Sequence, residues 1–217
     1  DLCCRLNREL IPVTRLFASP MVMVVHPSVP ANNLREYIAL AKAKPKSVNF
    51  ASGGTGSLTQ LVGETLKAAS GIAIDEVPYK SIGAEVPDLL AGHVLTGFLA
   101  PSAVAQHIKV GKLRALAVAD PRRLAMLPDV PTTAEAGLPG WEATGWNGVY
   151  APAGTPEPII KRLHEELARA LTSPDIRADA TTFGWVLGGD RPEEFAAYVR
   201  AEMEKWGKVI REANIRV

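Results

Sequence analysis

The sequence predicts an α/β protein built around a largely parallel β-sheet. Short apolar runs of strand length alternate with longer amphipathic segments through most of the chain, which is the pattern of strands covered by helices. Two strand-to-helix junctions and a mostly helical last third favour the same class. Composition agrees, because 217 residues with 47% hydrophobic and 22% charged residues suit one large domain or two small ones.

The first predicted elements are a buried strand and a capped helix. Met21 to Pro27 is an apolar run of strand length. Asn32 or Asn33 then supplies a cap for a helix that ends at residues 42–45. The apolar residues of this helix recur at intervals of three and four, so one stripe faces the strand. They are Leu34, Tyr37, Ile38 and Ala41.

The junction Ser52-Gly53-Gly54-Thr55-Gly56-Ser57 is the most informative feature of the chain. It joins a predicted strand at Val48 to Ala51 to a predicted helix at Leu58 to Ala69, which Gly71 ends. Glycines let the backbone approach a ligand closely, and the first amides of a helix lack internal partners at the positive end of its dipole. The junction is therefore a candidate anion site. Ordinary turn and N-cap preferences also explain the same residues.

Three better-known motifs do not match this junction. A phosphate-binding P-loop needs a lysine after its last glycine, where this chain has Ser57 and Leu58. The glycine spacing of a dinucleotide fingerprint ends here in Thr59, and no nucleophile elbow surrounds Ser57. What remains is a cradle for a small anion, without catalytic residues.

A second strand-to-helix turn follows at Tyr79 to Gly83, between a predicted strand at Ile72 to Tyr79 and a helix at Ala84 to Leu90. The carboxyl ends of parallel strands open at one edge of a sheet, so both turns are expected to face one ligand. Tyr79 and Lys80 are candidates for lining that site. A buried structural tyrosine and a solvated lysine are equally good interpretations.

Two further strands complete a lobe of about five strands. They are predicted at Val94 to Ala100 and Leu113 to Ala119, with a short helix from Pro101 to Val110 between them. From Asp120 to Trp146 the chain is rich in proline and glycine, which predicts a segment that crosses between lobes.

The last third combines few strands with long helices. Strands are predicted at Trp146 to Ala151 and at Thr182 to Leu187. Thr155 is the expected N-cap of a first helix and Ser173 that of a short one, and a long helix covers Pro192 to Ala213. Two long helices need more sheet than these two strands provide.

Charge and hydropathy exclude several classes of partner. Lys and Arg number 24 against 23 Asp and Glu, which leaves no excess of charge for gripping nucleic acid or an anionic membrane. The longest apolar run, Pro20 to Val25, is far shorter than the roughly 20 residues that a membrane-spanning helix needs, so no direct membrane insertion is expected. Residue 1 is Asp, and no secretory leader opens the chain.

No metal, cofactor or catalytic group is expected. Cys3 and Cys4 are neighbours without a second thiol pair, and the four histidines are scattered along the sequence. Glu85 and Asp88 share a helix at a spacing of three, where exposed acids usually form a solvated face.

Several long motifs carry a resemblance to one family. They lie at Val24 to Ser28, Asn49 to Ser57, Val77 to Lys80, Ile108 to Val118, Leu127 to Gly137, Leu138 to Trp141, Ala151 to Pro156 and Pro192 to Phe195. Together they resemble the Bug-type extracytoplasmic solute receptors of tripartite tricarboxylate transporters, over nearly the whole chain. Family members normally begin with a strand and a Pro-Gly-Gly turn, and this chain starts after that point, as if truncated.

The resemblance implies a two-lobed clamshell of the periplasmic-binding-protein type (type II), with lobe one incomplete. Residues 1–20 would be a remnant of lobe one and the crossover, residues 21–142 lobe two, and residues 143–217 the rest of lobe one. The implied function is capture of a di- or tricarboxylate, or a similar small organic acid, by backbone amides and lobe closure. The implied location is the periplasm, with membrane transporter subunits as partners.

The resemblance also fixes the expected site and leaves alternatives open. Ser52, Gly53, Gly54, Thr55, Gly56 and Ser57 would supply the amides, and Tyr79 would line the same cleft. Trp146 would stack on a ligand at the cleft mouth, or else pack the junction between lobes. The rival classes are an enzyme, the effector-sensing domain of a transcription regulator, and a truncated fragment that binds nothing.

Overall fold

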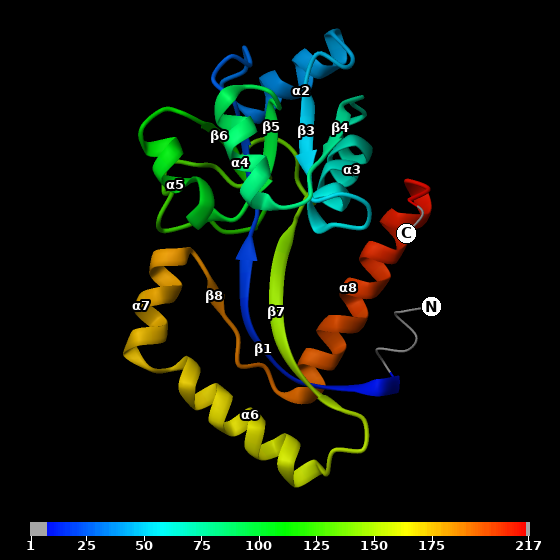
Figure 1. Ribbon diagram of the computed structural model, residues 1–217, viewed down its shortest axis with the longest axis vertical. Coiled ribbons are helices and arrows are strands. Elements are labelled where there is room, and N and C mark those ends of the chain that lie inside the picture. Colours follow the sequence, from blue (N-terminus) through cyan, green and yellow to red (C-terminus); the bar gives the residue numbers. More distant parts are fainter. Residues whose placement is uncertain (1–7, 216–217) are drawn as a thin grey trace. The chain divides into compact units, whose positions relative to one another are not determined.

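The computed structural model describes residues 8–215, and the chain divides into two compact units (Figure 1). Unit 1 consists of Asp1–Ser19 and Gly145–Lys208. Unit 2 consists of Pro20–Thr144 and Val209–Val217. Each unit has its own β-sheet, with three strands in unit 1 and five in unit 2 among the described residues.

The sheet of unit 2 has the strand order β4-β3-β5-β2-β6. β3 is parallel to both β4 and β5, whereas β2 is antiparallel to both β5 and β6. The prediction of a largely parallel sheet is therefore wrong for β2. All four residues of β2 are buried. A strand that is buried on both faces is apolar throughout, so its sequence does not show whether it runs parallel or antiparallel to its neighbours. The strands are β2 (Val22–Val25), β3 (Asn49–Ser52), β4 (Asp75–Pro78), β5 (Thr96–Leu99) and β6 (Arg114–Val118).

Four helices accompany this sheet, and they begin and end close to the predicted residues. The side chain of Asn33 accepts a hydrogen bond from the amide of Glu36, which confirms one of the two predicted caps of α2. Gly71 ends α3 in the left-handed conformation, as expected. The helices are α2 (Leu34–Ala43), α3 (Leu58–Ser70), α4 (Ile82–Ala91) and α5 (Pro101–Lys109).

The segment that follows β6 packs onto unit 2 itself. The amide of Val118 donates to Pro131 (2.8 Å), and the amide of Thr133 donates back to Val118 (3.0 Å). Trp141 is buried, with its ring 6.0 Å from that of Phe98, and its indole N–H donates to Thr65 Oγ1 (3.1 Å). The proline- and glycine-rich chain up to residue 144 thus contributes to the core of unit 2.

The sheet of unit 1 has the order β7-β1-β8, with β1 (Leu10–Pro20) in the centre. No strand was predicted over these residues. β1 therefore provides part of the additional sheet that the two long helices were expected to need. Pro12 and Arg15 interrupt the alternation that marks a strand. β7 (Thr144–Pro152) agrees with the prediction, and β8 (Val186–Leu187) pairs antiparallel with Phe17 and Ala18.

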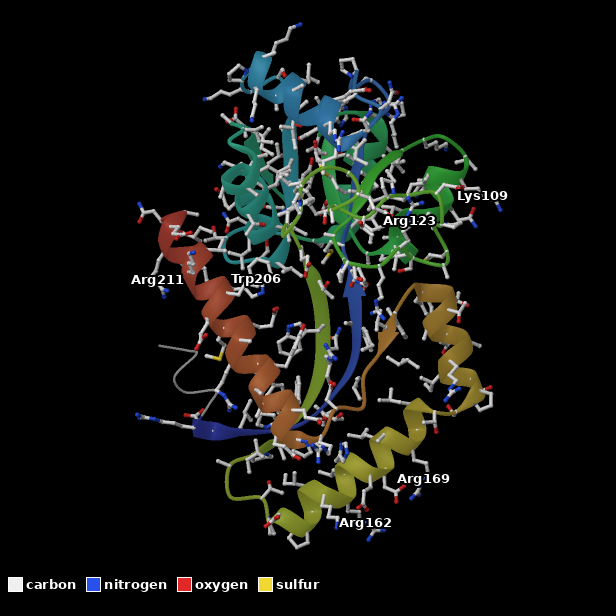
Figure 2. The ribbon with its side chains drawn as sticks, turned by 180° about the vertical axis from the view of Figure 1, so that it is seen from behind. Lys109, Arg123, Arg162, Arg169, Trp206 and Arg211 are labelled. Carbon is white, nitrogen blue, oxygen red and sulfur yellow. The ribbon has the colours of Figure 1, made fainter. Side chains whose placement is uncertain are left out.

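Among the described residues, the helices that lie wholly or mainly in unit 1 are α6 (Glu157–Leu171), α7 (Pro174–Phe183) and α8 (Pro192–Glu212). Ile160 of α6 forms a buried cluster with Val13 of β1 and Ala151 of β7, and Leu167 of α6 packs against this cluster. Arg162 and Arg169 point away from the sheet on the other side of this helix (Figure 2). α6 therefore has an apolar side toward β1, although Leu163 of the same helix is exposed.

Two predicted details of unit 1 are wrong. Pro156, not Thr155, is the N-cap of α6, because the Thr155 hydroxyl instead donates to the carbonyl of Pro152 (2.7 Å). The predicted strand from Thr182 to Leu187 is mostly absent. Helix α7, capped by Ser173, continues through Phe183, so only Val186 and Leu187 are left to pair.

No helix within residues 8–215 combines the length and the apolar character that crossing a membrane requires.

Glu85 of α4 contradicts the expectation of a solvated acidic face. It is 0% exposed, and neither carboxyl oxygen has a hydrogen-bond partner among the described residues. A Cβ added at Gly97 would lie 2.9 Å from Leu89 Cδ2 and 3.4 Å from Glu85 Oε1, so this glycine allows the close packing around Leu89 and borders the carboxyl. Burial raises the pKa of Glu85 to about 7, which favours the neutral acid. Asp88, in contrast, is only half-buried and accepts a hydrogen bond from Tyr79.

We expect Glu85 to make the protein less stable as the pH rises. Its pKa in the folded chain, about 7, lies above the ordinary value of 4.5, so the folded state holds its proton more tightly. The stability that proton binding at Glu85 contributes is fully present below the ordinary pKa. It is lost as the pH rises through the pKa of Glu85 in the folded chain. Glu85→Gln should abolish this dependence and raise the free energy of unfolding at about pH 8 by up to about 3 kcal/mol.

Urea unfolding from about pH 5 to about pH 8 measures this effect. Asp129→Asn is the matched control, because Asp129 is an exposed acid of the same unit. If Glu85→Gln keeps the pH slope of the unaltered protein, Glu85 is ionised in the folded state and the assignment is wrong.

Candidate functional site

The Gly-rich loop, residues Ser52 to Ser57, leaves the carboxyl end of β3 and enters α3. Ser52 is the last residue of β3, and Ser57 is the N-cap of α3, whose hydroxyl accepts from the amide of Gln60 (3.3 Å). Gly54 and Gly56 have φ angles of 87° and 77°, which side-chain-bearing residues rarely adopt. The glycines thus shape a tight turn that presents the N-terminus of α3.

The second turn meets the Gly-rich loop at the same edge of the sheet. The amide of Tyr79 donates to the carbonyl of Ser52 (2.7 Å), and a Cβ added at Gly54 would lie 3.8 Å from the Tyr79 carbonyl. Parallel pairing of Ser52 with Pro78 produces this meeting. The backbone of Tyr79 therefore borders the loop.

The side chain of Tyr79 is hydrogen-bonded to α4. Its hydroxyl donates to Asp88 Oδ2 (2.9 Å), and burial together with this acid raises the pKa of Tyr79 to about 12. The side chain is therefore held half-buried against α4, and it is the backbone of Tyr79 that borders the loop.

Four amides of the Gly-rich loop donate to acceptors in the loop or in the first turn of α3. The pairs are Gly53 to Thr59 Oγ1 (2.8 Å), Gly54 to Ser52 Oγ (3.1 Å), Gly56 to Gln60 Oε1 (2.8 Å) and Ser57 to the carbonyl of Gly54 (3.1 Å). The sequence predicts that the amides that bind the ligand come from Ser52 to Ser57. Each of these four amides instead has an acceptor within the loop or the first turn of α3, as polar backbone groups generally do.

Three other amides have no such partner. Those of Thr55, Leu58 and Thr59 donate no hydrogen bond to any group within residues 8–215. Leu58 and Thr59 are the first two residues of α3, where the helix dipole is positive. These amides are the donors that remain for an anion.

Glu76 of β4 is a member of the site that the sequence analysis missed. One of its oxygens accepts from the Ser52 hydroxyl, and the other accepts from Gln60 Nε2 (2.9 Å). Ser57 and Gln60 have the spacing of a capping box, a signal that could have identified Gln60. No local pattern marks Glu76, because it reaches the loop only through strand pairing.

Trp146 lies in unit 1, whereas the loop and Tyr79 lie in unit 2. Its indole N–H donates to Glu202 Oε2 (3.3 Å). Its ring meets those of Phe195 and Tyr198 edge-on, at centroid distances of 5.6 Å and 5.7 Å. These contacts describe a half-buried packing residue of unit 1.

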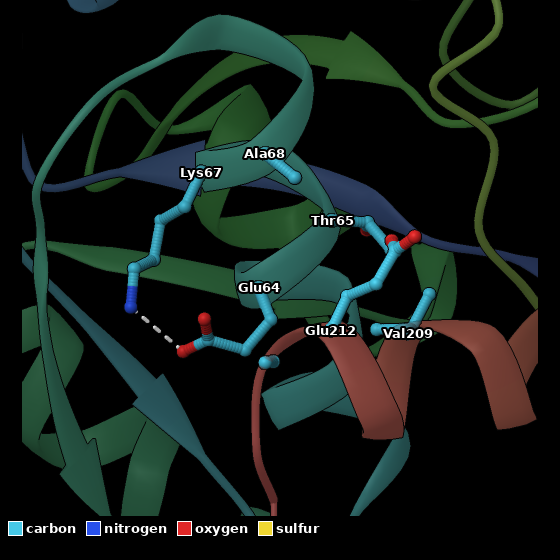
Figure 3. A pocket seen from close by; sticks show the side chains of 7 residues that line it. Glu64, Thr65, Lys67, Ala68, Val209 and Glu212 are labelled. Carbon is cyan, nitrogen blue, oxygen red and sulfur yellow. Dashed lines mark hydrogen bonds and ion pairs between the residues drawn. The ribbon is translucent and has the colours of Figure 1, made fainter.

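A separate hollow of about 240 Å³ lies elsewhere in unit 2, between α3 and residues 209–213 (Figure 3). Two of its lining residues, Glu64 and Glu212, are acids, and its only lysine, Lys67, is paired with Glu64 (2.8 Å). Its charge therefore disfavours a carboxylate. Within residues 8–215, no three His, Cys, Asp or Glu side chains come together in a group that could hold a metal ion.

Known proteins resemble the chain along nearly its full length. A family model described as "Tripartite tricarboxylate transporter family receptor" matches residues 2–215. Protein BugT of Bordetella pertussis is 34% identical over 209 residues, which cover 96% of this chain and 64% of BugT. A protein of Pseudomonas sp. (strain P51), from the tcbD-tcbE intergenic region, is 34% identical over 210 residues, 96% of this chain and 62% of that protein. The chain thus spans somewhat less than two thirds of these relatives.

Solved structures support the same assignment. A Rhodopseudomonas palustris protein with adipate has a TM-score of 0.86 at 31% identity, over 96% of this chain and 70% of that one. The periplasmic binding protein BugD has a TM-score of 0.82 at 28% identity, over 95% and 70%. MatC from R. palustris, with bound malate, has a TM-score of 0.82 at 29% identity, over 93% and 69%. The fold is therefore the mixed α/β fold of periplasmic binding proteins, and the chain belongs to the tripartite tricarboxylate transporter receptor family, whose members are solute-binding receptors and not enzymes.

Proposed function

We propose that this protein captures a small organic carboxylate in the periplasm and presents it to the membrane subunits of a tripartite tricarboxylate transporter. The observation that carries the proposal is the set of three unpartnered amides, Thr55, Leu58 and Thr59, at the start of α3. Structures similar to this chain were solved with adipate and with malate. A dicarboxylate or a tricarboxylate is therefore the ligand class to test first.

Backbone amides suit this task physically. A carboxylate accepts several hydrogen bonds at once, and bonds to an ionised group are worth about 1.5–3 kcal/mol each. The helix dipole adds to the attraction within the first turn. Such a site recognises charge and shape without a basic side chain, so the ligand need not be visible in the sequence.

The proposed site has distinct roles for its members. Ser52, Gly53, Gly54, Gly56 and Ser57 shape the turn, whereas Thr55 with the first two residues of α3 would donate to the ligand. Tyr79 would wall the site. Trp146 would stack on the ligand from lobe one.

The proposal also includes the lobes and their motion. Residues 21–142 would form lobe two, and residues 1–20 with residues 143–217 would contribute to lobe one. Closure of the lobes on the carboxylate would be the mechanism of capture, as in other binding proteins.

Removing a single amide tests the carboxylate site. Leu58→Pro deletes one free donor at the first position of α3, where proline is favoured, and Ser57 before it is already extended (φ −71°, ψ 153°). We expect dissociation constants for adipate or malate, measured by calorimetry, to rise about tenfold or more.

Leu58→Ala is the matched control, since it shortens the same side chain and keeps the amide. Its affinity should stay within about twofold of the unaltered protein. Equal affinities of the proline and alanine variants would place the ligand elsewhere, and turnover of any of the acids would contradict a receptor.

The proposed stacking role of Trp146 has its own test. Tyr150 also packs on Phe195, at a centroid distance of 5.3 Å, so Trp146→Leu and Tyr150→Leu each remove one ring from the same cluster. Both should lower the free energy of unfolding, by about 2–4 kcal/mol. Only Trp146→Leu should weaken carboxylate binding, by about threefold to tenfold. If the two variants bind alike, Trp146 is a packing residue alone.

A further inference from the structure

Glu76 is linked to the amides of Gly54 and Gly56 by two chains of hydrogen bonds, which we call relays. Each relay passes through one side chain, Ser52 or Gln60. On one side, the Ser52 hydroxyl donates to Glu76 and accepts from the amide of Gly54 (3.1 Å). On the other, Gln60 Nε2 donates to Glu76 (2.9 Å), while Gln60 Oε1 accepts from the amide of Gly56 (2.8 Å). The carboxylate of Glu76 thus accepts a hydrogen bond from each of the two side chains, Ser52 and Gln60, that hold these amides.

The chemistry of the carboxylate fixes the direction of both relays. An ionised carboxylate only accepts hydrogen bonds, so Ser52 and Gln60 must turn their hydrogens toward Glu76. Their oxygen lone pairs are then directed at the loop. The amides of Gly54 and Gly56 consequently have acceptors supplied to them before any ligand arrives.

The charge of Glu76 is also uncompensated by a cation. No ion pair of Glu76 with Lys, Arg or His is found among the described residues, whereas the neighbouring Asp75 is paired with Lys46 (3.9 Å). A carboxylate ligand at the start of α3 therefore meets the positive end of a helix and a fixed negative charge together. Repulsion grows with the charge of the ligand end that enters the site.

We infer that Glu76 is a positioning residue that keeps the Gly54 and Gly56 amides bonded within the loop and makes the site select a ligand end carrying a single carboxylate. The inference rests on the proposed carboxylate site and adds a selection rule to it. A linear dicarboxylate, with its charges far apart, fits the rule. A tricarboxylate with clustered charges does not.

Amide hydrogen exchange tests the positioning role without any ligand. Glu76→Gln keeps the shape of the side chain but offers one oxygen and one NH₂ group, so at least one of the two relays must reverse. We expect the amide of Gly54 or of Gly56, or both, to exchange about tenfold faster. The amide of Gly53 should not change, because its acceptor is Thr59 Oγ1, which does not contact Glu76.

Two further variants keep this test decisive. Gln60→Met leaves Glu76 in place and should accelerate exchange at Gly56 alone. Asp75→Asn removes the neighbouring charge and should leave the loop unchanged. Equal protection of both glycine amides in Glu76→Gln and in the unaltered protein would overturn the positioning role.

Calorimetry tests the selection rule with a monocarboxylate, adipate and citrate. Glu76→Gln should strengthen citrate binding about threefold to tenfold and adipate binding less, and added salt should shrink this gain. Asp75→Asn should change each affinity by less than about twofold. The same gain for all three acids, or none, would refute the rule.

The failures of the two proposals are distinguishable. If no carboxylate binds to either protein, the proposed function fails and the selection rule with it, while hydrogen exchange still decides the positioning role. If the unaltered protein binds and Glu76→Gln binds identically, only the inference about Glu76 fails.

Discussion

The parallel pairing of β3 with β4 is the constraint on which the candidate site depends. Its register places Ser52 beside Pro78 and Phe50 beside Glu76. Both strands therefore end at one edge, where the Gly-rich loop meets the turn at Tyr79. The same register brings Glu76 to Ser52 and Gln60, although 24 residues separate Glu76 from Ser52 in sequence. Without this pairing, neither the backbone of Tyr79 nor the carboxyl of Glu76 would reach the loop.

Two acids of unit 2 differ in their hydrogen bonding. Glu76 has a donor for each of its oxygens, Ser52 Oγ for one and Gln60 Nε2 for the other. Glu85 has no donor for either oxygen and is fully buried, so burial alone determines its pKa and favours the neutral form. The two acids lie in one small unit, yet only the carboxyl of Glu76 has hydrogen-bond donors among the described residues.

Sequence reasoning identified the elements whose evidence is local and missed those that depend on pairing. The caps at Asn33 and Ser57 and the stop at Gly71 follow from the residues themselves, and so does the position of the Gly-rich loop. The direction of β2 was wrong because a strand buried on both faces carries no directional signal. β1 was missed because its pattern is interrupted, and Glu85 because the spacing of acids does not show which face of a helix is covered.

The position of the Gly-rich loop between β3 and α3 was predicted, whereas its internal hydrogen bonds were not. The N-terminus of a helix carries the equivalent of about half a positive charge. Glu76 carries a full negative one, so the helix dipole alone does not guarantee an attractive field at this edge. In the proposed site, the amides of Thr55, Leu58 and Thr59 would donate directly to the carboxylate, whereas Glu76 would act through Ser52 and Gln60. Such a site would gain its affinity from direct hydrogen bonds and its selectivity from the more distant charge of Glu76.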